Sequence, residues 1–153
     1  MLAGTGRTDK MNHILPGFLS IVITASLLSV MVARPATAAE NCGNLPGQAE
    51  MNACYGKALA DEDRALNTTY REIGKRLAAS KEATGRLLAA ERAWIAYRDA
   101  ECAFSASGSA GGSLYPMLIA SCEAALTNRR NSDLRAYLQC TEGDLSCPVP
   151  AAR

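Results

Sequence analysis

The chain has 153 residues, enough for one domain, with 16 Lys and Arg against 15 Asp and Glu. This near balance excludes a general nucleic-acid binder, because such proteins need a basic surface to displace the counterions of phosphates.

The first 38 residues have the features of a secretory signal peptide. Arg7 and Lys10 precede an apolar run at residues 14–33, and the small residues PATAA follow. A cut after Ala38 would leave a nearly neutral chain without its only histidine, His13. An uncleaved membrane anchor is the alternative, since the run is near the length that spans a bilayer. We predict a periplasmic or secreted protein with no stable membrane insertion after cleavage.

Six cysteines follow this segment, and an even number predicts disulfide bonds in an exported chain. They are Cys42, Cys54, Cys102, Cys122, Cys140 and Cys147. The turn-rich tail favours a bond between Cys140 and Cys147. If the first two helices form a hairpin, Cys102 would lie about one helical turn from Cys54, which makes Cys54 a candidate partner. Cys42 is an equal alternative as the partner of Cys102.

The absence of histidine after the signal peptide excludes several kinds of site. Ser-His-Asp and Cys-His catalysis need an imidazole, as do His-ligated metals. No paired CxxC spacing indicates zinc either. We therefore expect no enzyme activity, no metal and no cofactor; a carboxylate-based hydrolase is the catalytic alternative that survives.

Three amphipathic helices are predicted, and no segment alternates as strands do. Apolar residues recur at helical spacing over residues 48–79, and Ser80 supplies an N-cap for a second helix at about 81–104. The run SASGSAGGS predicts a loop, and Pro116 opens a third helix that ends near residue 138.

The predicted fold is all-α, a small helical domain built on a long helical hairpin plus a third helix and stapled by disulfides. Residues 39–139 would form this domain. Residues 140–153 would form a disulfide-closed or flexible tail.

The second predicted helix contains the stretch AERAWIAYRDAEC, with the chain's only tryptophan, Trp94. Trp94, Arg98 and Cys102 share one face of this helix. Arg98 can therefore stack on the indole and reach a carboxylate of the first helix, where the acids at 61–63 lie near the same level. We interpret the stretch as a structural joint and not as an active site.

Several motifs follow one another in a recognisable order between residues 42 and 138: CGNLPGQAEMNAC, LNTTY, ERAWIAYRDAEC, GGSLYP and CEAALTNRRNSDL. This order resembles the LprI-type lysozyme inhibitors, a family of bacterial exported proteins that commonly has Gln where this chain has Glu91. The resemblance implies a small exported helical domain, and its founding activity is inhibition of lysozyme. The motif residues to which it assigns a structural role are Trp94, Tyr97, Arg98, Asp99, Gly111, Gly112 and Arg130.

The expected function is therefore inhibition of a lysozyme-type glycosidase, by filling a cleft that holds catalytic carboxylates. The two candidate contact loops are residues 105–115, with Ser113 and Tyr115, and residues 141–146, with Glu142 and Asp144. The alternative is a non-catalytic periplasmic binding or scaffolding module that contacts another envelope protein or peptidoglycan. The expected partner is a lysozyme or another envelope protein, and not nucleic acid.

Overall fold

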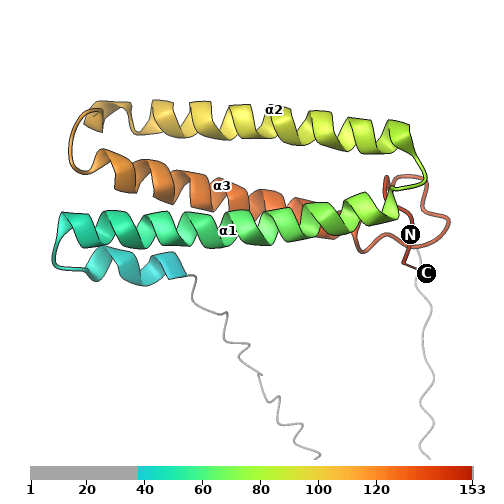
Figure 1. Ribbon diagram of the computed structural model, residues 1–153, viewed down its shortest axis with the longest axis horizontal. Helices are drawn as coiled ribbons and strands as arrows, with labels where there is room; N and C mark the ends of the chain where they lie inside the picture. The colour runs from blue at the N-terminus through green and yellow to red at the C-terminus, as the bar shows by residue number, and fades with distance from the viewer. Residues whose placement is uncertain (1–37, 153) are drawn as a thin grey trace, which may run out of the picture. The chain divides into compact units, whose positions relative to one another are not determined.

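The computed structural model describes residues 38–152, so the predicted signal peptide lies almost wholly outside the described residues. The elements are η1 (Ala38–Asn44), α1 (Gln48–Arg76), α2 (Lys81–Ser105), η2 (Ser107–Ser109) and α3 (Tyr115–Tyr137) (Figure 1). The described residues contain no strand, which confirms the all-α prediction. Each long helix begins and ends within three residues of its predicted bounds.

The turn between α1 and α2 is fixed by side-chain capping. The Ser80 hydroxyl accepts a hydrogen bond from the backbone N–H of Ala83 at 3.2 Å, as an N-cap residue should. The Leu77 carbonyl at the end of α1 accepts from the Ser80 backbone N–H at 2.8 Å, and the Thr84 hydroxyl lies 3.2 Å from the same carbonyl oxygen. The two helices are therefore connected as the predicted hairpin.

The two helices of this hairpin nevertheless have few contacts with each other, because α1 packs chiefly along α3. Helices α1 and α3 lie side by side over most of their length, whereas α2 lies farther from α1 and rests on α3 (Figure 1). The buried face of α3 explains the close approach, since it presents Ala120, Ala124 and Thr127 at alternating spacings of four and three residues. Small side chains at these positions allow the backbones to come near each other.

The apolar core lies at the end of the bundle that contains the α1–α2 turn, here called the turn end. Ile73 of α1 and Leu134 of α3 are fully buried there, and Val149 of the C-terminal segment packs on the same cluster. The tail is thus disulfide-closed and docked. The opposite end, here called the loop end, holds η1 and the connection between α2 and α3 (Figure 1).

Three disulfides form the expected framework, and all six cysteines are used. Cys140 pairs with Cys147, which confirms that prediction. The other pairs are Cys42–Cys54 and Cys102–Cys122, each with a Cα–Cα distance of 5.6 Å. A bond between Cys54 and Cys102 is therefore wrong, because α2 rests on α3 and its last turns meet Cys122 of that helix.

Leu134 and Leu145 offer a matched pair for testing where the core lies. Leu134 is 0% exposed and Leu145 is 101% exposed. Leu134→Ala should lower the free energy of unfolding by about 2–5 kcal/mol, because it leaves a cavity in the core. Leu145→Ala should change it by less than about 0.5 kcal/mol. Urea unfolding followed by circular dichroism measures both, and equal losses would show that the core has been placed wrongly.

Candidate functional site

Arg98 is the centre of a polar joint between the three helices. Its guanidinium donates to the Asp63 carboxylate of α1 at 3.1 Å and to the Thr127 hydroxyl of α3 at 3.2 Å. It also lies over the Trp94 ring, 5.4 Å from the centroid, and pairs with Asp99. The side chain is only 13% exposed. The expected contacts of Arg98 with the indole and with a first-helix acid are both present.

A second ion pair joins α2 to α3 one to two turns away. Glu91, 7% exposed, accepts hydrogen bonds from the Nε and Nη2 atoms of Arg130, the first at 3.0 Å. A carboxylate taken out of water is costly unless a partner is close, and the planar fork of arginine supplies one. Glu91 and Arg130 therefore stabilise each other in a position where either charge alone would be destabilising.

The joint holds a helix that has little apolar anchorage of its own. Glu91 and Cys102 are the buried residues of α2, while Ala83, Leu87 and Trp94 pack against the core only in part. Two ion pairs and the Cys102 disulfide thus fix the position of α2. These contacts indicate a structural role, because both guanidinium groups and their carboxylates already form ion pairs with one another.

Glu123 of α3 lies beside this joint and has a raised pKa. Burial is the main cause, and the carboxylates of Asp99 and Asp63 add to it, whereas Arg98 opposes it. The charged form of Glu123 is therefore disfavoured in the folded protein. Its protonation state is a property of the joint that responds to pH.

The loop end carries the first candidate contact loop, residues 105–115. Gly111 has φ +78°, a conformation that suits glycine, and Asn52 of α1 donates to the Ser113 carbonyl at 3.1 Å. Tyr115 is half-buried, and Leu114 is exposed. Phe104, the aromatic residue just before this loop, is 77% exposed. The structure thus presents an aromatic side chain beside an ordered polar loop.

The second candidate loop, residues 141–146, lies at the turn end within the Cys140–Cys147 ring. Asp144 accepts hydrogen bonds from the hydroxyl and backbone N–H of Ser146 at 2.6 and 2.9 Å, and these bonds lower its pKa. Gly143 has φ +88°, and Glu142 is exposed. The ring therefore presents two acids and the fully exposed Leu145.

The sequence comparisons agree with the motif resemblance. Residues 38–134 match the family described as lysozyme inhibitor LprI. The chain belongs to the LprI lysozyme-inhibitor family. An uncharacterized protein of Rhizobium meliloti (strain 1021) is 34% identical over 113 residues, which cover 67% of this chain and 81% of that relative. No solved structure gives a significant match.

The LprI match divides the candidate residues into two groups. It includes the joint with Trp94, Arg98 and Arg130 and the whole loop end, whereas it stops before the ring with Glu142 and Asp144. The two candidate loops lie at opposite ends of the bundle (Figure 1).

The predicted motif residues of this LprI chain do not form one cluster. Trp94, Arg98 and Asp99 come together, and Arg130 lies in the neighbouring ion pair. Tyr97 is exposed on α2, while Gly111 and Gly112 shape the loop. A Cβ at Gly112 would lie 3.1 Å from the Ser109 carbonyl oxygen, so the tight turn favours glycine.

Sequence reasoning missed two features of this LprI chain, the partner of Glu91 and the exposure of Phe104. The pairing of Glu91 with Arg130 was not foreseen, although a charged residue at a buried helical position is itself a signal of pairing. The exposure of Phe104 was also not foreseen, because a phenylalanine at the end of an amphipathic helix is usually buried. In the described residues no helix is long and apolar enough to cross a membrane, and no group of acids, cysteines or histidines could hold a metal ion.

The buried pair and an exposed pair provide a test of the joint. Glu91→Ala should lower the free energy of unfolding by about 3 kcal/mol, because Arg130 is left without its partner. Glu91→Gln should cost less, since the amide oxygen can still accept from Arg130. Glu82→Ala, which breaks the exposed Glu82–Arg86 pair, should cost less than about 1 kcal/mol. Urea unfolding measures all three, and similar values for the two alanine variants would contradict a joint held by Glu91.

Glu123 predicts a specific dependence of stability on pH. Because its folded pKa is raised from 4.5, the folded protein holds this proton where the unfolded chain has released it, so stability falls as pH rises through the folded pKa. Glu123→Gln should remove this loss, giving a higher melting temperature than the parent at pH 7 and a similar one at pH 4. Melting curves across this range provide the measurement; a lower melting temperature for the variant at pH 7 would contradict the assigned burial.

Proposed function

We propose that this protein is exported and inhibits a lysozyme-type glycosidase through its loop end. The observation that carries the proposal is the LprI match, which includes the loop end and excludes the ring at the turn end. An activity shared by the family has to rest on the shared residues. Residues 105–115 are therefore favoured over residues 141–146 as the contact loop.

The chemistry of the loop end suits a cleft that normally holds sugars. Residues 104–118 carry no charge, and the loop offers serine hydroxyls, including that of Ser113, beside the exposed ring of Phe104. Sugar-binding clefts offer hydrogen-bonding groups for hydroxyls and apolar surface for the ring faces. A hydroxyl-rich segment with an aromatic neighbour can satisfy both kinds of group while blocking access to the catalytic carboxylates.

Order in the free loop would reduce the cost of binding. The Cys102–Cys122 disulfide closes its base, and the Ser105 hydroxyl donates to the Cys102 carbonyl at 3.1 Å. Successive turns then place the N–H of Ser109 on the Ala106 carbonyl and that of Gly112 on the Ser109 carbonyl. A loop held in one conformation loses little entropy when it enters a cleft.

Export is supported by the use of every cysteine in a disulfide. Such bonds form and persist in the periplasm or outside the cell, where thiols are not kept reduced. The leader-like composition of residues 1–38 supports the same compartment.

The alternative function, a periplasmic binding or scaffolding module, is favoured by one observation. Leu88, Ile95 and Tyr97 leave apolar surface exposed on α2. Exposed apolar side chains on a helix can contact another envelope protein. The inhibition assay below separates the two functions, because a scaffolding module would not slow a lysozyme.

The proposal predicts that the purified, oxidised protein slows lysis of a cell-wall suspension by at least one lysozyme of a panel. Phe104→Asp should weaken inhibition by about thirtyfold, the effect of losing one central contact residue. Leu145→Asp, on the ring outside the family match, is the control and should inhibit as the parent does. Melting curves confirm that both variants are folded. Undiminished lysis at a large molar excess over every enzyme would reject the proposal, and equal inhibition by the Phe104 variant would reject the loop end as the contact.

A further inference from the structure

The turn end carries two adjoining hollows beside α1. One, of about 500 Å³, lies between α1 and α3 and is lined by Arg71, Lys75 and Arg135 together with Glu72. The second, of about 510 Å³, shares Glu72 and Lys75 and continues past Arg76 to the C-terminal segment. We call the first of these, with its charged residues Arg71, Glu72, Lys75 and Arg135, the basic hollow.

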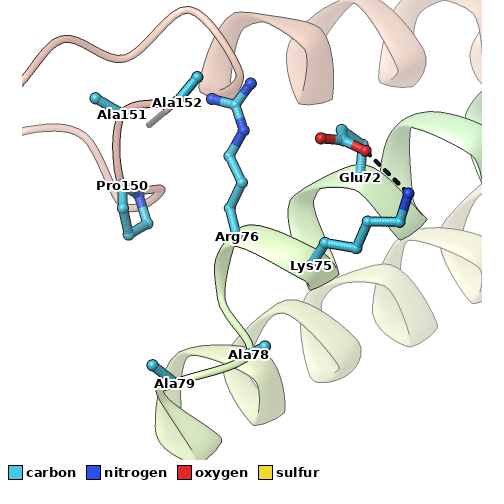
Figure 2. Close-up of a pocket in the computed structure, with 8 residues that line it drawn as sticks. All are labelled: Glu72, Lys75, Arg76, Ala78, Ala79, Pro150, Ala151 and Ala152. Atoms are coloured by element: carbon cyan, nitrogen blue, oxygen red, sulfur yellow. Dashed lines mark hydrogen bonds and ion pairs between the residues drawn. The ribbon is translucent and has the colours of Figure 1, made fainter.

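Figure 2 shows the residues that line the second hollow. Arg76 extends from the end of α1 toward the C-terminal segment at Ala151 and Ala152, while Glu72 and Lys75 lie along the same helix. The Arg76 guanidinium donates to the Leu138 carbonyl at 2.9 Å, which ties the end of α3 to α1. The walls of the basic hollow are therefore held in place in the free protein.

Positive charge in the basic hollow is largely uncompensated. Glu72 provides the one carboxylate of the hollow, and its Oε2 atom lies 3.3 Å from Nζ of Lys75 in an exposed ion pair. Arg71 donates to the Thr68 hydroxyl at 3.2 Å, and neither Arg71 nor Arg135 has an ion pair within residues 38–152.

Cations elsewhere in the described part of the chain are divided between groups with a carboxylate partner and groups without one, the latter being Arg76, Lys81, Arg92 and Arg129. Those in ion pairs outside the hollow are Lys57, Arg64, Arg86, Arg98 and Arg130. What distinguishes the basic hollow is that two guanidinium groups without an ion pair in the described chain lie on facing helices, with the ammonium group of Lys75 beside them. Such a grouping repels itself unless an anion is present.

The geometry suits a phosphate group in particular. A guanidinium presents its N–H donors as a planar fork that matches two phosphate oxygens, and Arg71 and Arg135 each bring one such fork to the hollow. The hollow is of the size that accepts a small ligand or a headgroup. We propose that the basic hollow is a binding site for a phosphate-bearing anion.

The site lies far from the loop end, because α1 has 29 residues and so spans about 43 Å. Binding at the basic hollow therefore leaves residues 105–115 accessible. Phosphate groups could come from the headgroups of anionic lipids or from soluble phosphate esters. Both sources share the chemistry that the hollow recognises, and they differ in whether the phosphates are arrayed on a surface.

The experiment measures binding of the purified, oxidised protein to two probes. Vesicles of phosphatidylcholine with phosphatidylglycerol are tested by co-sedimentation, with phosphatidylcholine vesicles as the neutral reference. Soluble glycerol phosphate is tested by titration calorimetry at low ionic strength. Binding to the anionic vesicles alone assigns a lipid headgroup, and binding to glycerol phosphate assigns a soluble ester; both support the site, and no binding to either probe overturns it.

Charge-matched variants locate the binding. Arg71→Gln/Arg135→Gln should weaken binding by about thirtyfold, because each cation near an anionic surface contributes a factor of about five. Arg92→Gln/Arg129→Gln removes the same charge from two exposed arginines outside the hollow and should weaken binding much less. Melting curves establish that both double variants are folded. Equal losses in the two would show that only net charge matters, and would overturn the site.

Discussion

The position of α2 depends on the burial of two guanidinium groups. Arg98 and Arg130 lie where α2 meets its neighbours, and each would be destabilising without its carboxylate. Because ion pairs and hydrogen bonds are directional, they fix the register of α2 along the bundle as well as its attachment, which a small apolar contact could not do as sharply. The stack of Arg98 on Trp94 adds the chain's one tryptophan to the same joint.

The disulfides extend this order to segments that have no core of their own. Cys102–Cys122 joins α2 to α3 where the helices give way to a loop of small residues, and Cys140–Cys147 closes a ring beside the core at Val149. Restricting the unfolded chain is the main way in which such bonds stabilise a small domain. Segments rich in glycine and serine can therefore be ordered at both ends of the bundle.

Helix content was predictable from the sequence because apolar spacing and capping act locally. The Ser80 cap and the helix bounds follow from a few neighbouring residues. The choice of α3 as the main partner of α1 was not predictable in this way, since it depends on how closely alanine-faced helices can approach. The pairing of the cysteines depends on which helices are neighbours. The alternatives left open for Cys42, Cys54 and Cys102 could therefore be resolved only from the structure. A contact of Arg98 with one of the acids at 61–63 was foreseen, and the structure shows that it is Asp63. The Glu91–Arg130 pair was not foreseen, because helical spacing indicates burial and does not identify a partner.

A nearly neutral total charge conceals an uneven distribution along the bundle. In the middle, the buried cations are neutralised by acids of the same chain, so little of their field reaches solvent. The loop end has no charge over residues 104–118. At the turn end the basic hollow gathers Arg71, Lys75 and Arg135 around one glutamate, while the ring carries Glu142 and Asp144. The positive charge of the basic hollow can attract an anion there, while recognition at the loop end has to rely on shape, hydroxyls and the exposed Phe104 ring. Since the joint fixes α2 to its neighbours, the two ends are held a constant distance apart, and a ligand at one end need not compete with a partner at the other.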